Sequence, residues 1–288
     1  MSDTLPLVAN VSILFTELPY LDRFAAAAAC GFQGVESWWP FETAAPEDAD
    51  IDRFIGAIAA SGIPLVGLNL FGGDLTRGDR GVLSHPDRQP EFDHNLAVVA
   101  AIAQRTGCRV FNALYGLRRA GMNTADQDAT ALMNLSTAAQ QLGDLGGTVL
   151  VEALSADSVP DYPLRTARDA ARIVERTREV AGRDEIGVLF DVYHLASSGE
   201  DLESAVQEYR ALIAHVQLAD SPGRGEPGSG RLPFPDLLEG LWRSGYRGAV
   251  AAEYSPTTRT EASLGWVEHM PRVRLRPVRV TTAEECST

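Results

Sequence analysis

The sequence lacks several features that would assign it to a common class of protein. Only three of its 288 residues are cysteines, and Cys30, Cys108 and Cys286 lie far apart. An odd number of scattered cysteines predicts reduced thiols and no disulfide framework, which is typical of a cytoplasmic protein. No run of about 20 apolar residues occurs, so we expect no contact with a membrane interior. The opening MSDTLPLVAN has no basic stretch and no long apolar stretch, so we expect no signal peptide.

Positive charge is also scarce. The chain has 25 basic and 39 acidic residues, which gives a formal net charge of −14. Proteins that bind nucleic acids usually present basic surfaces to the phosphates, so the sequence predicts no nucleic-acid partner. No GxGxxG motif follows the first expected strand, and no GxxxxGK[ST] motif occurs. The common nucleotide-binding signatures are therefore missing.

What the sequence does contain is an eightfold alternation of short β-rich runs and longer helical patterns. The expected strands are 7–15, 34–39, 64–71, 109–116, 148–155, 186–194, 213–220 and 248–255. The expected helices are 24–30, 47–61, 90–106, 124–143, 165–181, 200–211, 235–244 and one that starts near Thr260. Several strands are almost continuously apolar, as in a parallel sheet that is buried on both faces.

Eight βα units in a chain of this length predict an α/β fold, a single (β/α)₈ TIM barrel over residues 1–272. A doubly wound open sheet is the alternative. Residues 273–288 lose the pattern, and we expect them to form a loosely held C-terminal extension. Nothing in the sequence decides the oligomeric state, so a homo-oligomer stays open.

The last four expected strands each end with a polar side chain that can bind a metal. These side chains are Glu152, Asp191, Gln217 and Glu253. In a TIM barrel the carboxyl ends of the strands share one rim, which is the active face. A buried ionised carboxylate is costly unless it is paired or bound to a cation. Three carboxylates and an amide oxygen suit Mg²⁺ or Mn²⁺ better than zinc. The alternative is a set of solvated rim residues with ion-pair partners.

Other polar residues lie near the same expected rim. His194 follows Asp191 by three residues, and Arg224 and Glu226 lie on a Gly- and Pro-rich loop, 221–230, so we expect these three residues to contact substrate. Arg224 could hold a substrate carboxylate through two parallel hydrogen bonds, although a surface ion pair is the ordinary role of a loop arginine. His194 could face the pocket or be a structural hydrogen-bonding group.

The first half of the chain offers weaker candidates. Glu36 ends the second strand, and Asn69 and Asn112 lie near the ends of strands three and four, where they could contact substrate. His215 lies two residues before Gln217 and shares its inward direction, so we expect it to orient ligands from below. The charged loop 72–81 is long for a βα connection, and such loops are often functional or mobile.

Several segments carry a resemblance to a known family. They are HVQLADSPGRGEPGSG, AAEYSPTTRTEASLGW, FDVYH, NVSILFTELPYLDRF followed by CGFQGVE, and NLFGGDLTRGDRG. In order and spacing they resemble the hydroxypyruvate isomerase family, within the xylose isomerase-like TIM barrels. The resemblance covers roughly residues 7 to 268.

The resemblance implies metal ligation by Glu152, Asp191, Gln217 and Glu253, and acid/base roles for Glu152 and Glu253. Related sugar epimerases usually have histidine where Gln217 stands, so Gln217 favours the isomerase branch. His194 and Arg224 match substrate-contacting positions of those epimerases. The segments GLNLFGGD and NALYGLRR depart from the common family pattern within the expected pocket, so the reaction type is better determined than the substrate.

The implied reaction converts hydroxypyruvate to tartronate semialdehyde through a cis-enediolate whose charge the metal stabilises. Isomerisation of 2-oxo-tetronate and epimerisation of a ketose at carbon 3 are alternatives on the same barrel. A barrel that binds a ligand without catalysis is another. A metal-dependent phosphodiesterase or endonuclease is more distant, because it needs several histidine ligands and a basic face, and the chain has five histidines in all.

Overall fold

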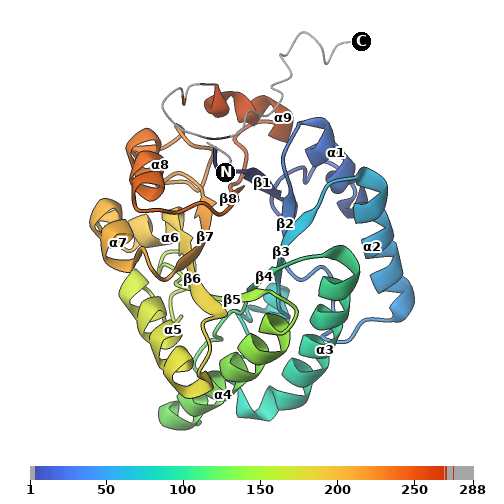
Figure 1. Cartoon of the computed structure of the whole chain (residues 1–288), viewed down its shortest axis with the longest axis vertical. Helices are drawn as coiled ribbons and strands as arrows, with labels where there is room; N and C mark the ends of the chain where they lie inside the picture. Colours follow the sequence, from blue (N-terminus) through green and yellow to red (C-terminus); the bar gives the residue numbers. More distant parts are fainter. Residues whose placement is uncertain (1–3, 269, 271–274, 276–288) are drawn as a thin grey trace.

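The computed structural model describes residues 4–268, 270 and 275, and it contains a closed parallel barrel (Figure 1). Its eight strands follow one another around the barrel in sequence order, and β1 closes it by pairing with β8. The strands are β1 (Leu7–Asn10), β2 (Val35–Ser37), β3 (Leu65–Asn69), β4 (Val110–Asn112), β5 (Thr148–Glu152), β6 (Ile186–Asp191), β7 (Ile213–Leu218) and β8 (Val250–Ala252). The predicted TIM barrel is confirmed, and closure between β1 and β8 excludes the open doubly wound sheet.

Helices surround the strands in an outer ring (Figure 1). They are α1 (Arg23–Ala29), α2 (Asp48–Ser61), α3 (Gln89–Thr106), α4 (Thr124–Gly143), α5 (Ala167–Ala181), α6 (Val192–Ser197), α7 (Leu202–Tyr209), α8 (Phe234–Arg243) and α9 (Thr260–Ser263). Short 3₁₀ helices are η1 (Tyr20–Asp22), η2 (Leu75–Arg77), η3 (Pro86–Arg88) and η4 (Leu264–Val267). None of the helices in the described residues is long and apolar enough to cross a membrane.

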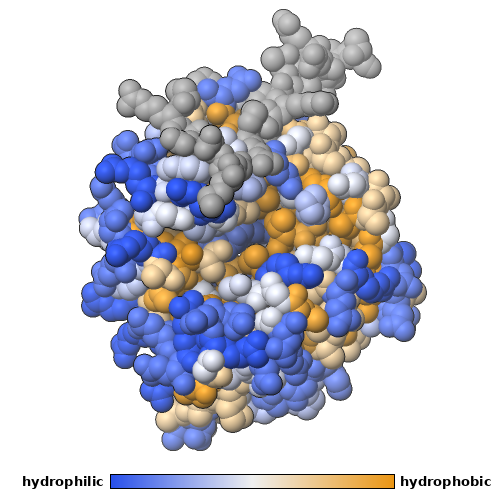
Figure 2. Space-filling view, viewed as in Figure 1, coloured by the Kyte–Doolittle hydropathy of each residue, from blue (hydrophilic) through white to orange (hydrophobic). Residues whose placement is uncertain are grey.

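Local sequence signals account for the helix ends. In α2, the buried residues Ile51, Phe54 and Ile58 recur at helical spacing and form the inward stripe, and Gly62 ends the helix with φ 69°. In α5, Thr166 and Asp169 form a reciprocal capping box. Figure 2 shows apolar residues near the centre of one face and beside α2, while hydrophilic residues cover much of the outer ring.

Each predicted strand range is longer than the strand that the structure has, and the sixth range shows one physical reason. The apolar run 186–194 was expected to be a single strand, but β6 ends at Asp191 and α6 begins at the next residue. The reason is that Asp191 caps α6, since its Oδ1 accepts a hydrogen bond of 2.9 Å from the backbone N–H of His194. The strand thus turns into a helix at the rim, and His194 lies in the first turn of that helix.

Two further predictions concern the cysteines and the C-terminal residues. Cys30 and Cys108 are free and buried, as expected for reduced thiols, whereas Cys286 lies outside the described residues. Of the predicted extension 273–288, only Leu275 is described; it is buried and forms an isolated bridge with Leu5. The prediction of a loose extension otherwise falls on residues outside the described part.

Candidate metal centre and substrate pocket

The barrel brings the four predicted metal ligands to one rim. Glu152 and Asp191 are the last residues of β5 and β6, Gln217 is the penultimate residue of β7, and Glu253 directly follows β8. Asp191 and Gln217 are direct partners in the β6–β7 pairing. All four side chains are buried, with exposed fractions between 2% and 5%. Neighbouring parallel strands therefore place four oxygen-bearing side chains along one part of the barrel rim.

The acids lie close enough to repel one another. Ligand atoms of Glu152, Asp191 and His194 all fall within 4.8 Å of one another. Burial, together with the charge of Asp191, raises the pKa of Glu152 to about 8. Burial also raises the pKa of Glu253 well above its usual range, and the attraction of Arg224 only partly offsets this. Such a cluster must therefore either keep a proton on one of its carboxylates or bind a cation that allows all of them to be ionised.

Unpartnered oxygen atoms indicate a cation more directly. Among the described residues, Asp191 Oδ2 and Gln217 Oε1 are buried acceptors without a hydrogen-bond partner. A buried polar atom without a partner costs roughly 1–3 kcal/mol, so such atoms need a physical explanation. Two bare oxygens beside two further carboxylates are suited to a hard divalent ion. The residues present therefore fit Mg²⁺ or Mn²⁺.

The direction of the Gln217 amide is fixed by Glu36. Gln217 Nε2 donates to Glu36 Oε1 at 2.7 Å, and a carboxylate can only accept, so the NH₂ group must face Glu36. Gln217 Oε1 is then left on the other side of the amide, without a partner in the described structure. Glu36 thus determines that Gln217 offers an oxygen and not a nitrogen.

Glu36 itself is an ionised group held by three donors. Asn10 Nδ2 donates to its Oε1 at 3.0 Å, and His215 Nε2 lies 2.6 Å from its Oε2. Burial raises the pKa of Glu36, but the charge of His215 and the hydrogen bonds from His215, Gln217 and Asn10 outweigh burial, so the pKa is lowered. Both oxygens of Glu36 are occupied from within the barrel. His215, which the sequence predicts to orient ligands, contacts Glu36, and Glu36 in turn accepts a hydrogen bond from Gln217.

His194 faces the acids with one ring nitrogen and the protein with the other. The backbone N–H of Ser155 donates to its Nδ1 at 3.2 Å. Burial lowers the pKa of His194, which favours the neutral ring. A neutral ring that accepts at Nδ1 must carry its proton on Nε2, which lies 4.0 Å from Asp191 Oδ2. His194 therefore presents a hydrogen-bond donor on this side, not a lone pair for a metal.

Glu253 is held on its outer side. Its Oε1 accepts from Trp38 Nε1 at 2.9 Å and from an Arg224 guanidinium nitrogen at 3.1 Å. Arg224 lies over the ring of Tyr193, 5.4 Å from its centroid, and its Nε is a buried donor with no partner in the described residues. Arg224 adopts φ 56°, an uncommon conformation for a side chain with a Cβ. The fully buried Asp220 supports this turn by accepting from three backbone N–H groups of the loop.

A cavity of about 350 Å³ opens beside Glu152 and Glu253, while Asp191 and Gln217 do not line it. Its lining includes Asn69, Glu152, His194, Arg224 and Glu253, and this volume lies at the small end of ligand pockets. Glu36 and Glu226 do not line it. Glu226 instead accepts hydrogen bonds from the backbone and hydroxyl of Thr257, and so joins the loops after β7 and β8.

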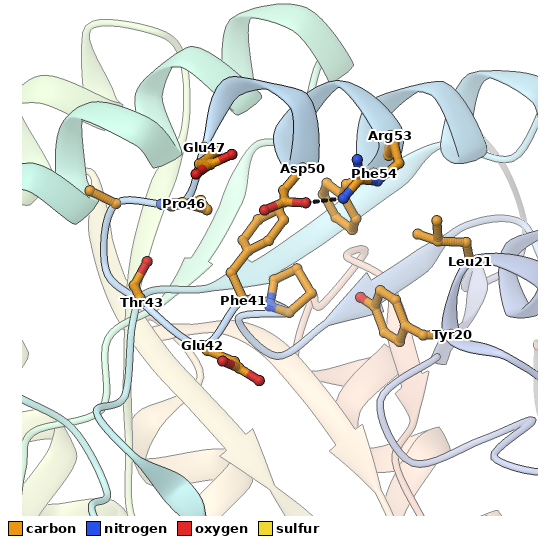
Figure 3. A pocket seen from close by; sticks show the side chains of 12 residues that line it. Tyr20, Leu21, Phe41, Glu42, Thr43, Pro46, Glu47, Asp50, Arg53 and Phe54 are labelled. Atoms are coloured by element: carbon orange, nitrogen blue, oxygen red, sulfur yellow. Dashed lines mark hydrogen bonds and ion pairs between the residues drawn. The ribbon is translucent and has the colours of Figure 1, made fainter.

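A larger cavity, of about 590 Å³, lies elsewhere, beside η1 and α2. Figure 3 shows Tyr20, Phe41 and Phe54 around it, with the Asp50–Arg53 ion pair on its helical side. It contains none of the residues predicted for the site. Cavity size alone would therefore have pointed away from the buried acids.

Several site residues were missed from the sequence. Asn10 holds Glu36, Ser155 fixes the ring of His194, and Arg80 lines the cavity from the long loop after β3. Asn112, which was considered as a substrate contact, instead donates to Glu152 Oε2 at 2.7 Å. Asn10 could have been found from the sequence, because it is a polar residue at the end of an apolar strand. No local pattern marks Ser155, because its partner is 39 residues away.

Comparison with known proteins gives consistent matches over nearly the whole chain. Residues 24–270 match the family described as xylose isomerase-like TIM barrel. A protein of Streptomyces coelicolor named putative hydroxypyruvate isomerase is 46% identical, over 90% of this chain and 94% of its own length. The hydroxypyruvate isomerase of Escherichia coli is 33% identical, over 90% and 97%. A 2-oxo-tetronate isomerase of Cupriavidus necator is 34% identical, over 90% and 96%.

Proposed function

Since this chain belongs to the xylose isomerase-like TIM-barrel family, with hydroxypyruvate isomerases among its relatives, we propose that it is a metal-dependent isomerase of small hydroxy-keto acids. The reaction interconverts a hydroxy-ketone acid and its aldehyde isomer, with hydroxypyruvate and tartronate semialdehyde as the first pair. The single observation that carries the proposal is the pair of bare buried oxygens, Asp191 Oδ2 and Gln217 Oε1, among raised-pKa carboxylates.

Glu152, Asp191, Gln217 and Glu253 would hold one divalent ion, Mg²⁺ or Mn²⁺. When bound, such an ion supplies Lewis acidity for adjacent carbonyl and hydroxyl oxygens and offsets the negative charge that develops on them. His194 stays outside the ligand set, because its Nε2 carries a proton. It is placed to donate that proton in a hydrogen bond to a substrate oxygen.

Glu152 and Glu253 would move the proton between the two substrate carbons. One removes a proton from the carbon that bears the hydroxyl, and a cis-enediolate results; the other, or the same one, returns a proton to the neighbouring carbon. The hydroxyl proton passes to the former carbonyl oxygen, so that a hydroxy-aldehyde forms with no net gain or loss of protons. Glu253 Oε1 and Glu152 Oε2 already accept hydrogen bonds, which leaves Glu253 Oε2 and Glu152 Oε1 as the less engaged oxygens. Each glutamate is thus fixed in direction and still has an oxygen for substrate.

The remaining contacts orient the substrate. Arg224 and Asn69 both line the cavity, and their N–H groups would contact substrate oxygens. The substrate contacts expected of Glu36 and Glu226 gain no support, since each carboxylate is occupied by protein donors. We place Glu36 among the groups that orient Gln217. A cytoplasmic location and the lack of a nucleic-acid partner are further proposals, and they rest on the cysteine pattern and the charge of −14.

A second candidate is isomerisation of 2-oxo-tetronate, which the 34% identity to the Cupriavidus necator protein favours. Both candidates use the same acids and the same cation, and differ only in the length of the substrate. Epimerisation of a ketose is less supported, because Gln217 stands where the related epimerases usually have histidine.

Side-by-side assays test the proposal. Purified protein is freed of metal with EDTA, restored with Mg²⁺ or Mn²⁺, and offered hydroxypyruvate, 2-oxo-tetronate and a ketose. We expect turnover of one of the two keto acids only after metal is restored. Equal turnover in the metal-free protein would refute the catalytic role of the metal. Turnover of the ketose alone would show that the protein is an epimerase and not a keto-acid isomerase.

A further inference from the structure

We propose that Arg80 binds the carboxylate of the substrate and so makes the site specific for keto acids over uncharged sugars. This inference rests on the proposed isomerase function and assigns its substrate class to one residue. Arg80 lies on the loop between β3 and α3, and it lines the same cavity as Glu152, His194 and Glu253.

The charges in the pocket call for a second positive group. Glu152, Asp191 and Glu253 face one guanidinium, that of Arg224, which is 3.1 Å from Glu253. A divalent ion balances the two negative charges that remain. A substrate carboxylate then adds a further negative charge, and a carboxylate in a confined site needs a partner of its own.

Arg80 is a cationic residue of the pocket that is not already neutralised. Its NH1 donates only to backbone oxygens, those of Leu75 at 3.1 Å and Asp79 at 2.6 Å. Within the described part of the chain it forms no ion pair, unlike the nearby Arg77 and Arg88. Its other guanidinium N–H groups remain for a ligand, and the planar fork of arginine suits a carboxylate.

The loop that carries Arg80 is held in place by its own hydrogen bonds. Gly81 N–H donates to Gly72 O at 2.7 Å, and the Asp79 carboxylate accepts from the Asp74 backbone at 2.9 Å and from Arg88 at 2.7 Å. Gly81 has φ 111°, and a Cβ there would lie 2.1 Å from the backbone oxygen of Leu114. The loop therefore packs directly against the segment after β4. This ordered contact fixes the position of Arg80 over the cavity.

The test compares a charged substrate with an uncharged one of the same shape. Dihydroxyacetone carries a CH₂OH group where hydroxypyruvate has its carboxylate. For Arg80→Met in the metal-loaded enzyme, we expect kcat/KM for hydroxypyruvate to fall about 10- to 100-fold, mainly through KM, while the low value for dihydroxyacetone stays unchanged. Arg80→Lys should recover part of the loss, because it keeps the charge but not the fork.

Arg77→Met is the matched control, since Arg77 lies on the same loop with a side chain that is 87% exposed. This variant should leave kcat/KM unchanged for both substrates. Pyruvate, which keeps the carboxylate and carbonyl but has no hydroxyl, gives a readout without turnover. Its Kd, measured by calorimetry, should rise about 10- to 100-fold in Arg80→Met. Unchanged pyruvate affinity, or an equal loss for both substrates, would overturn the inference. Failure of the proposed function is distinguishable from these outcomes, because the unaltered enzyme would then convert neither hydroxypyruvate nor 2-oxo-tetronate.

Discussion

The two halves of the barrel rim carry different chemistry. Strands β5 to β8 contribute three acids and one amide, whereas β1 to β4 contribute three amides and one acid, Glu36. In the second half, Glu152 and Glu253 have raised pKa values, and Asp191 and Gln217 each have a buried oxygen without a partner, while Glu36 in the first half has a lowered pKa and donors on both oxygens. The glutamates of the second half are thus harder to ionise than the glutamate of the first half.

This difference indicates a division of work between the halves. The first half supplies donors that aim the ligands of the second half, since Glu36 turns the Gln217 amide and Asn112 holds Glu152. Groups that orient metal ligands commonly affect metal affinity almost as strongly as some ligands do. Exchanging carboxylates for amides in either half tests whether the two halves have these different roles.

The largest effect is expected in the second half. Glu152→Gln and Glu253→Gln should each lower kcat for hydroxypyruvate by about 10²- to 10⁴-fold, because a general acid or base contributes on that order. The folded state should persist, since glutamine keeps the shape and removes a repelled charge. Steady-state kinetics and circular dichroism provide the measurement. Near-full activity of Glu253→Gln would refute its role in proton transfer.

A smaller effect is expected in the first half. Glu36→Gln should weaken Mn²⁺ binding about 10- to 100-fold, because glutamine leaves one acceptor oxygen for Asn10, Gln217 and His215 and adds an NH₂ donor, so the direction of the Gln217 amide is no longer fixed. Calorimetric titration of metal-free protein measures this directly, without any activity assay. If metal affinity stays as in the unaltered protein, the Gln217 oxygen is oriented by something other than Glu36.

The pH dependence of Mn²⁺ affinity tests the raised pKa of Glu152 in the second half of the rim. Because the pKa of Glu152 is raised to about 8 without metal, a cation that binds below that pH must displace a proton. Mn²⁺ affinity should therefore fall as the pH decreases from about 8, by up to about tenfold per unit for each proton displaced. Titrations in buffers of different ionisation enthalpy count the protons released. An affinity that is constant between about pH 6 and 8 would contradict this picture.

The smallest effect is expected away from both halves of the rim. Glu226→Gln weakens only the bridge to Thr257 between two loops, so we expect a loss of about 0.5–1.5 kcal/mol in stability and less than about threefold in KM. Thermal melting and steady-state kinetics test this. A large rise in KM would restore Glu226 to the substrate contacts expected from the sequence.

The fold was largely predictable because its signals are local and repeated. Alternating apolar strands and helices, closed by glycines such as Gly62, gave the barrel and most helix bounds to within two or three residues. The predicted strands are longer than those of the structure, most clearly at 7–15, 109–116 and 248–255, and the run 186–194 shows one reason. An apolar run does not reveal where the backbone changes direction, and the change at Asp191 depends on its side chain as a helix cap.

By itself the sequence determined the barrel and the candidate ligands Glu152, Asp191, Gln217 and Glu253, because each of these polar residues interrupts an apolar run late in an expected strand, and all strand ends of a barrel share a rim. Only the tertiary structure decided which oxygens are bare, which face of the Gln217 amide points inward, and which nitrogen of His194 carries the proton. Those properties depend on partners that are tens to hundreds of residues away along the chain, such as Ser155 for His194 and Glu36 for Gln217. Hydrogen-bond direction is a property of such pairs, and pairs form only when the barrel closes.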